Sequence, residues 1–428
     1  MIKTIEIKQN LRLARIEIPN CAIAKGIITI DLYETNSLTD QTIIECFGDL
    51  LLSGTTSLSR DELMDEVNSL GSSVDVHFND GVLTVEVSGT EKNWKKTIAI
   101  VSDVLQNPTF TAKEIKRATK LAFNNLNDDK EDAKAIAQAA FGNNFFTPTD
   151  RRAGVQITTL QSHLSKLTNK DMKQMFTRMY TKPWITSVTG SKSTCTSFAK
   201  LVTELTDSIE VVDNATSSKG AATTSAKLLL NDIPSKQNLD LNIGLLVDLK
   251  PGDLEFPALV FGISVLAKWG GFAGRLMSTV REKEGLTYGI YGKLAGYNTV
   301  DTGYFVIQTF FSPTQVTQGL ESTFREINKI YKYGITETEH ASFRTIMETQ
   351  TIMRNDSPVS SIRVLHEFNK LGFSIEQMES YEKQLQSVSK QEVDTAIKKY
   401  LNPKLMVISA AGPTKQVEKE LKILCKKL

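Results

Sequence analysis

The sequence has few of the residues that build disulfide frameworks or cysteine-based metal sites. Its four cysteines are scattered over 428 residues without CxxC spacing, at Cys21, Cys46, Cys195 and Cys425. This pattern predicts reduced side chains that pack in the interior, in a reducing compartment. It excludes a small disulfide-stapled fold and a cysteine zinc knuckle.

Histidine is equally scarce. The four histidines are His77, His163, His340 and His366, and no two are three to five residues apart. A helical pair of metal-ligating histidines needs that spacing, so no local pair exists. We expect each histidine to be a surface or capping residue.

Strong net charge and long apolar runs are also missing. Fifty Lys and Arg residues balance 49 Asp and Glu residues, which gives a net charge of +1. This balance predicts no nucleic-acid partner and no anionic membrane surface, and no apolar run approaches a membrane span. The first 18 residues alternate like a strand and lack a signal peptide's apolar core, so we expect a cytoplasmic protein. A trimmed export signal would leave the same start, which keeps a periplasmic or secreted location open.

The sequence does contain apolar residues at the spacings typical of helices and of strands, and its length suits two domains. It predicts two strands in residues 2–33 joined by a turn near Pro19-Asn20, helices over 39–52 and 59–70, a strand pair over 74–89 turning at Asn79-Asp80-Gly81, helices over 94–105, 111–141 and 170–180, and a strand over 185–188. Ser59 is the expected N-cap of the second helix, and Gly71 its end.

A change of composition divides the chain. Residues 207–236 include DNATSSKGAATTSAK, which holds no bulky apolar side chain and is typical of a linker. We therefore expect an N-terminal half over 1–206, a linker over 207–236 and a C-terminal half over 237–428.

The two halves resemble each other in order and content. Matching residues are Phe47-Gly48 and Phe261-Gly262, Leu63-Met64 and Leu276-Met277, Asp80-Gly81-Val82 and Asp301-Thr302-Gly303, and Tyr180 and Pro183 with Tyr400 and Pro403. The offset drifts from 213 at Leu63 to 220 at Tyr180, as duplication with small insertions would leave it. The fold class we predict is α+β, with two homologous α/β-sandwich halves that each place helices on one face of a mixed or antiparallel sheet.

Residues 269–291, WGGFAGRLMSTVREKEGLTYGIY, carry the densest motif of the chain. Phe272, Leu276 and Val280 have helical spacing, Gly285 can end that helix, and residues 286–291 alternate like a strand. A helix that folds back on this strand would bring Arg281 and Tyr288 together. The structural alternative is that Arg281 complements the helix dipole and Tyr288 is a core aromatic with its hydroxyl at the rim.

The order Gly270-Gly271, Arg275-Leu276, Arg281-Glu282-Lys283 and Gly285-Leu286-Thr287-Tyr288 resembles the C-terminal signature of the pitrilysin/insulinase-type zinc peptidases (the inverzincin clan), including the mitochondrial processing peptidases. The resemblance covers nearly the whole chain. It implies two halves arranged as a clam shell around a chamber, with Arg281 and Tyr288 reaching the substrate near zinc. It also suggests peptide binding at Gly270 and Gly271 and along a sheet edge at Val76 and His77.

The zinc motif of that family is degenerate in this chain. The family carries His-x-x-Glu-His on its first core helix, where two histidines ligate zinc and the Glu is the general base, and a distant Glu completes the site. Aligned on Gly54-Thr55, the ligand, base and ligand positions fall on Glu45, Gly48 and Asp49, and the distant Glu falls on Asn124. Glycine cannot take a proton, so the general base is lost.

No other metal or catalytic set replaces the lost motif. Glu45, Asp49 and Asn124 offer only three oxygen-bearing side chains, too few to predict a Ca²⁺ or Mg²⁺ site, and Glu45 and Asp49 are expected to line a polar cavity wall. No GxSxG elbow, Walker loop or GxGxxG motif occurs.

The leading hypothesis is a non-catalytic subunit of a heterodimeric zinc peptidase. The resemblance implies that this chain supplies Arg281 and Tyr288 to a partner's site, binds no cofactor itself, and is no enzyme on its own because zinc is on the partner. The first alternative is an inactive homodimer that binds peptides or acts as a scaffold. The second is an enzyme with a relocated metal.

Overall fold

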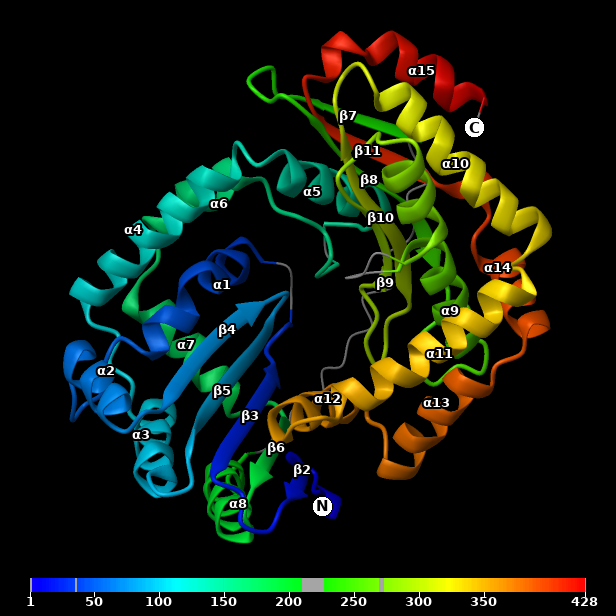
Figure 1. Cartoon of the computed structure of the whole chain (residues 1–428). Coiled ribbons are helices and arrows are strands. Elements are labelled where there is room, and N and C mark those ends of the chain that lie inside the picture. The colour runs from blue at the N-terminus through cyan, green and yellow to red at the C-terminus, as the bar shows by residue number, and fades with distance from the viewer. Residues whose placement is uncertain (1, 35–36, 149, 210–226, 269–272, 428) are drawn as a thin grey trace. The chain divides into compact units, whose positions relative to one another are not determined.

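The computed structural model describes residues 2–34, 37–148, 150–209, 227–268 and 273–427, and the helices and strands of that part are drawn in Figure 1. The chain forms two compact units. The first takes the chain up to Leu126, the chain from Val155 through α8 (Lys192–Thr206), and Ile352–Met378. The second takes Asn127–Gly154, the chain from β7 (Leu228–Asp232) to Thr351, and the chain from Glu379 onward.

Each unit therefore contains a segment from the other half of the sequence. Helix α5 (Ala133–Phe145) belongs to the second unit, and helix α12 (Pro358–Lys370) belongs to the first. Of the expected linker, residues 210–226 lie outside the described residues, whereas Leu228–Asp232 forms strand β7.

The first unit is built on a six-stranded mixed sheet. Its order is β1-β2-β6-β3-β5-β4, with β1 Ile2–Ile7, β2 Leu11–Glu17, β3 Ile23–Asp31, β4 Ser73–Asn79, β5 Val82–Thr90 and β6 Trp184–Gly190. Only β2 and β6 pair in parallel, and the other neighbours are antiparallel. Strand β4 is an edge of this sheet.

Helices cover both faces of the first sheet, and the alternation along β3 decides which side chains each face buries. Ile28 and Ile30 join the core that includes Phe47, Trp94 and Phe198. Ile27 points the other way and packs with α12. The helices on the first-core side and at its periphery are α1 Leu38–Leu51, α2 Arg60–Ser69, α3 Trp94–Gln106, α4 Ala112–Asp129, α6 Ile157–Leu164, α7 Asn169–Met179 and α8.

The second unit repeats this topology on a five-stranded sheet. Its order is β7-β11-β8-β10-β9, with β8 Leu239–Val247, β9 Ile290–Ala295, β10 Gly303–Phe311 and β11 Val407–Gly412. Here β7 and β11 are the parallel pair, as β2 and β6 are in the first unit, and β9 is the edge strand that corresponds to β4. The two-half α+β fold expected from the internal repeat is confirmed.

The second sheet also carries helices on both faces, so the expectation of helices on only one face was wrong for both sheets, because α12 and α5 cover the other faces. Helices α9 (Phe256–Ala267) and α10 (Val316–Tyr333) pack on one face, where the core includes Phe261, Phe305 and Ile327. Helix α5 packs on the other face, where Phe141 meets Val306. The remaining helices are a π-helix Met277–Lys283, α11 Glu337–Arg354, α13 Ile375–Ser387, α14 Lys390–Tyr400, α15 Glu418–Lys427 and the 3-10 turns Pro403–Leu405 and Thr414–Gln416.

Local sequence signals place most element ends correctly. Ser59 caps α2 in a capping box with Glu62, and the turn between β4 and β5 has positive φ at Asp80 and Gly81. Two expectations were wrong. Residues 2–33 form three strands because the chain turns back at residues 8–10, and the strand after Gly285 begins at Ile290 instead of Leu286. None of the described helices combines the length and apolarity needed to cross a membrane.

Candidate functional site

The degenerate motif lies on α1, where Glu45 is exposed and Gly48 is buried. Gly48 packs against the edge strand of its sheet. A Cβ atom at residue 48 would lie 3.2 Å from the Val76 carbonyl oxygen and 3.4 Å from its Cγ1. A larger side chain here would have to displace the backbone of β4. The close approach of α1 and β4 therefore favours glycine at residue 48, the position that aligns with the general base of the resembled family.

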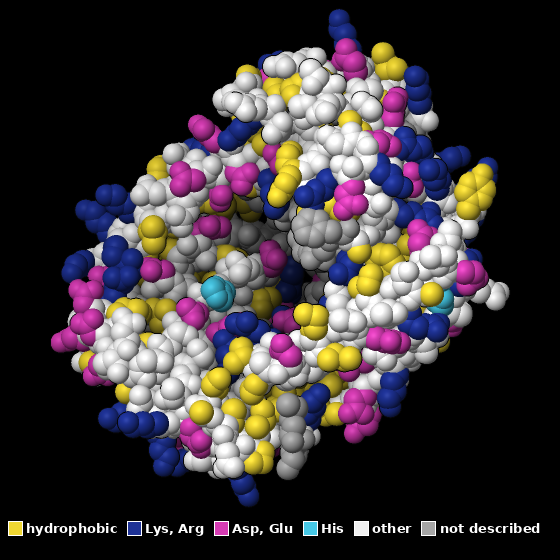
Figure 2. Space-filling model, in the orientation of Figure 1, with side chains coloured by type: hydrophobic (Ala, Val, Ile, Leu, Met, Phe, Trp, Pro, Cys, Tyr) yellow, Lys and Arg dark blue, Asp and Glu magenta, His cyan; other side chains and the backbone are white. Residues whose placement is uncertain are grey.

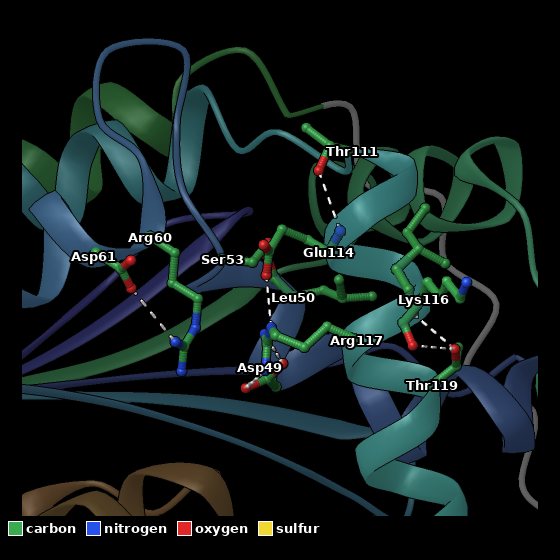
Figure 3. A network of polar contacts seen from close by, with 11 residues as sticks. Asp49, Leu50, Ser53, Arg60, Asp61, Thr111, Glu114, Lys116, Arg117 and Thr119 are labelled. Carbon is green, nitrogen blue, oxygen red and sulfur yellow. Dashed lines mark hydrogen bonds and ion pairs between the residues drawn. The ribbon is translucent and has the colours of Figure 1, made fainter.

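Asp49 is engaged by an arginine from α4. Figure 3 shows Arg117 reaching from α4 to α1, with its Nη2 2.5 Å from Oδ2 of Asp49. The same guanidinium donates from Nε to Glu114, one helical turn earlier, at 2.6 Å. One cation therefore holds two carboxylates, one from each helix.

The pKa of Arg117 is raised by this arrangement. Burial by itself lowers the pKa of the guanidinium, but hydrogen bonds from Arg117 to Glu114 and Asp49, and their negative charges, outweigh burial. Arg117 is thus a permanent positive charge beside the position that a zinc ligand occupies in the resembled family.

The remaining motif positions do not form a metal site. Asn124 is exposed on α4, two turns beyond Arg117. Burial, followed by Glu45 and Asp49, raises the pKa of the Cys46 thiol to about 12, so Cys46 is a protonated core residue and not a thiolate ligand. Within the described ranges, no three His, Cys, Asp or Glu residues are grouped so that they could hold a metal ion. The donor set does not fit zinc.

The expectation of surface or capping histidines was wrong for two of the four. His340 is buried, donates from Nε2 to the Val388 carbonyl at 2.9 Å, and packs on Phe261. His366 is only 3% exposed and lies between two hydroxyls. Both sit on helix faces that pack on other elements, which the scarcity of histidine alone did not indicate.

Arg281 and Tyr288 come together in the second unit. The Arg281 guanidinium carbon lies 4.7 Å from the centre of the Tyr288 ring, a cation–π distance. Arg281 is half-buried and contacts the Met277 sulfur, whereas Tyr288 is 75% exposed. The ring is therefore not a core aromatic, and most of the Tyr288 surface is open to solvent.

The backbone around Gly285 produces this contact. The π-helix Met277–Lys283 carries Arg281, and Gly285 follows with φ of 62° and no atom within 4 Å of where a Cβ would be. The amide of Leu286 then donates to the Val280 carbonyl at 2.9 Å, which turns the chain back along the helix. Tyr288 lies in a bend before β9 rather than on a strand, and this frees its side chain from the sheet.

Arg275, also part of the signature, has a structural role that the spacing did not reveal. Its guanidinium forms a bidentate pair with Glu339 at 2.6 and 2.7 Å and donates to the Gly334 carbonyl at 3.0 Å. Glu339 also accepts from the backbone of Thr336 at the start of α11. Arg275 thus ties the signature segment to the α10–α11 turn.

The other expected binding residues divide into two groups. Gly270 and Gly271 lie outside the described residues. Val76 and His77 are both on the edge strand β4 but point to opposite faces. Val76 packs toward α1 and the core, whereas His77 is exposed on the far face.

These features define a class of protein: a duplicated α+β chain with a half-buried Arg beside an exposed Tyr in one unit and a metal motif without its ligands in the other. Residues 48–149 match the family model described as insulinase (peptidase family M16). Residues 166–347 match the model described as the peptidase M16 inactive domain.

Individual proteins agree with this match. A non-peptidase homolog, YmxG, of Helicobacter pylori is 21% identical over 394 residues, which are 89% of this chain and 87% of that protein. An uncharacterized zinc protease of Streptomyces coelicolor is 33% identical over 78 residues, only 18% of this chain and 17% of that protein. A crystal structure titled as a peptidase M16 inactive domain from Pseudomonas fluorescens has a TM-score of 0.84 at 17% identity, with 97% of this chain and 99% of that chain covered.

The chain belongs to the M16 peptidase family and is an inactive homologue of its enzymes. The family resemblance expected from the Arg–Tyr signature and the degenerate zinc motif is confirmed.

Proposed function

We propose that this chain is the non-catalytic subunit of a two-chain zinc peptidase and supplies Arg281 and Tyr288 to substrate bound at the partner's zinc site. The observation that carries the proposal is the contact between a half-buried Arg281 and a largely exposed Tyr288. The guanidinium is anchored while the phenol is presented to solvent, so the pair can contact a peptide without rearrangement.

The chemistry of the pair suits peptide hydrolysis. The Arg281 guanidinium and the Tyr288 hydroxyl are both hydrogen-bond donors, and donors aimed at a scissile carbonyl stabilise the negative charge that develops on its oxygen. The cation–π contact holds the two donors on one side of the substrate. Removal of one such donor typically costs a factor of about 10²–10³ in kcat.

The first unit supports a role without hydrolysis of its own. The general-base position is Gly48, and the second ligand position is Asp49, which is paired with Arg117. Glycine has no side chain that could take a proton, and Asp49 cannot be released without breaking the ion pair that joins α1 and α4.

The proposal is tested by mixing this chain with a candidate zinc-bearing M16 subunit purified from the same cells and measuring cleavage of a quenched fluorescent peptide. We expect the mixture to cleave faster than the partner alone, and the Tyr288→Phe and Arg281→Met variants to lose about tenfold or more of that gain. No gain in the mixture, with both chains folded, would rule the proposal out.

A matched control separates the phenol's chemistry from a general surface effect. Leu254 is 90% exposed, lies in the same unit and contacts neither Arg281 nor Tyr288 in the pair described above. Leu254→Ala should leave the cleavage rate of the mixture unchanged.

The second candidate function is peptide capture by a homodimer without hydrolysis. The edge strand β4 favours it, because an edge offers backbone groups to an added strand and the exposed His77 would then lie beside the bound peptide. A labelled decapeptide should bind the chain alone by fluorescence anisotropy, and the same peptide with alternate N-methylated amides should not. Light scattering that finds only monomers would contradict the homodimer.

A further inference from the structure

A surface groove of the second unit lies away from the residues discussed so far. It runs along one face of α14 and is flanked by the end of α10, and its volume is 770 Å³. Residues 390, 394 and 398 recur at four-residue spacing along α14, and Tyr331, Lys332 and Tyr333 form the wall from α10. Figure 2 shows Lys and Arg side chains gathered along α10.

The groove is electropositive. Its lining has four lysines, Lys332, Lys390, Lys398 and Lys399, against two acids, Asp394 and Glu337. Asp394 is already used on both oxygens: Oδ1 accepts from the amide of Ile335 at 2.8 Å, and Oδ2 pairs with Lys390 at 2.7 Å.

Two of the lysines have no acidic partner. Lys399 pairs with Glu255 at 2.6 Å, outside the lining. Among the described residues, no carboxylate lies within ion-pair distance of Lys332 or Lys398. Both are exposed, and each instead lies near a tyrosine ring, Lys398 at 4.2 Å from the centre of Tyr331 and Lys332 at 5.0 Å from that of Tyr333.

The backbone holds the wall and the floor of the groove together. Gly334 ends α10 with φ of 72°, and a Cβ there would lie within 2.6 Å of the three carboxylate atoms of Asp394. The α10–α11 turn can therefore approach α14 this closely only with glycine at residue 334. Arg275 and Glu339 fix the same turn from its other side.

We propose that this groove is a docking site for an acidic, extended peptide segment of a partner protein. Two exposed ammonium groups without carboxylate partners complement Asp or Glu side chains. Cations already lie near both tyrosine rings, so these faces are poorly placed to stack nucleic-acid bases. The eight-residue span from Lys390 to Lys398 is about 12 Å long, which matches about four residues of extended chain at 3.3 Å each.

This inference does not depend on the proposed role of Arg281 and Tyr288. It is tested with the full-length chain and fluorescein-labelled octaglutamate by fluorescence anisotropy. We expect saturable binding at about 50 mM salt that weakens strongly at about 500 mM, because exposed charge pairs are screened. The double variant Lys332→Gln/Lys398→Gln should bind about tenfold more weakly, since it removes both of the exposed charges that would pair with the peptide.

A control variant of equal charge change is available in the same unit. Lys415 and Lys422 are exposed and pair with Asp232 and Glu418, so Lys415→Gln/Lys422→Gln should change octaglutamate affinity less than twofold. Equal losses in both double variants, or no binding of octaglutamate at low salt, would overturn the proposal. So would tighter binding of octathymidylate that depends on Lys332 and Lys398, which would assign the groove to nucleic acid.

Discussion

At the scale of single residues, the most informative contact is the ion pair between Arg117 and Asp49. A metal site holds two helices together through a shared cation, and here Arg117 of α4 does so through Asp49 of α1. The positive charge is part of the chain and cannot dissociate. This ion pair connects α1 and α4.

The first prediction concerns this pair. Arg117→Met should lower the free energy of unfolding by about 1 kcal/mol, because it leaves Asp49 and Glu114 without their cation while both side chains keep some solvent. Asp49→Asn in the same background should cost little more. A double-mutant cycle by urea unfolding measures the coupling.

Arg60 provides the comparison for Arg117. It pairs with Asp61 at 3.8 Å, and Asp61 is almost fully exposed. Arg60→Met should therefore change the unfolding free energy by only a few tenths of a kcal/mol. Equal effects at residues 60 and 117 would show that the α1–α4 pair has no special role.

At the scale of elements, α12 is held on the first sheet by a polar seam as well as by apolar contacts. His366 Nδ1 lies 2.8 Å from the Ser187 hydroxyl and Nε2 lies 2.8 Å from the Thr29 hydroxyl. One turn later, Asn369 donates to the Thr186 carbonyl at 3.0 Å and accepts from Arg12 at 2.7 Å. Buried polar groups need specific partners, so the seam sets where along the sheet α12 sits.

The second prediction follows from the buried imidazole. Burial, with a smaller contribution from Lys370, lowers the pKa of His366 from 6.5 to about 3, although Glu86 opposes the shift. The unfolded chain therefore binds a proton that the folded chain rejects between pH 6.5 and about 3. Stability is full above pH 6.5 and falls by up to about 1.4 kcal/mol per pH unit as the pH drops through this window.

Urea unfolding at pH 6.5 and pH 5 tests this expectation. The parent chain should lose about 2 kcal/mol more over this interval than His366→Gln, which cannot take up the proton. His77→Gln, at an exposed position of β4, should keep the parent's dependence on pH. A parent and a His366→Gln variant with the same slope would contradict the buried, neutral state of His366.

At the scale of the whole chain, the two units share one topology, and each also contains a helix from the other half of the sequence. The two sheets share their strand connectivity, yet each unit completes one sheet face with a helix from the other sequence half. Ile27 is covered by α12, and Val306 is covered by α5. Neither sequence half contains all of the residues that bury its own sheet.

The third prediction concerns the separated halves. A fragment of residues 1–206 should be poorly soluble and lack a cooperative thermal transition, because the face of its sheet that α12 covers would be exposed. A fragment of residues 227–428 should behave in the same way because it lacks α5. Mixing them during refolding should restore a cooperative transition by circular dichroism, whereas two independently stable fragments would show that the exchanged helices are dispensable.

Local sequence was sufficient for much of the fold and for part of the site. Apolar periodicity and capping residues located α1, α2 and the β4–β5 hairpin, because those signals act over a few neighbouring residues. The repeat indicated the duplicated α+β fold. The motif positions on Glu45, Gly48 and Asp49 stay a prediction from the chain, whereas the spacing of Arg281 and Tyr288 allowed their contact to be anticipated.

Tertiary structure alone decided the rest, because the partners are far apart in sequence. Arg117 reaches Asp49 across 68 residues, Arg275 reaches Glu339 across 64, and His366 reaches Ser187 across 179. No periodicity links such positions, and the same holds for the transfer of α5 and α12 between units. The sequence by itself determined which helices and strands form and that the zinc chemistry is lost. Only the folded chain determined which cation pairs with Asp49 and which helix covers which sheet, since those depend on contacts that exist only after the chain has packed.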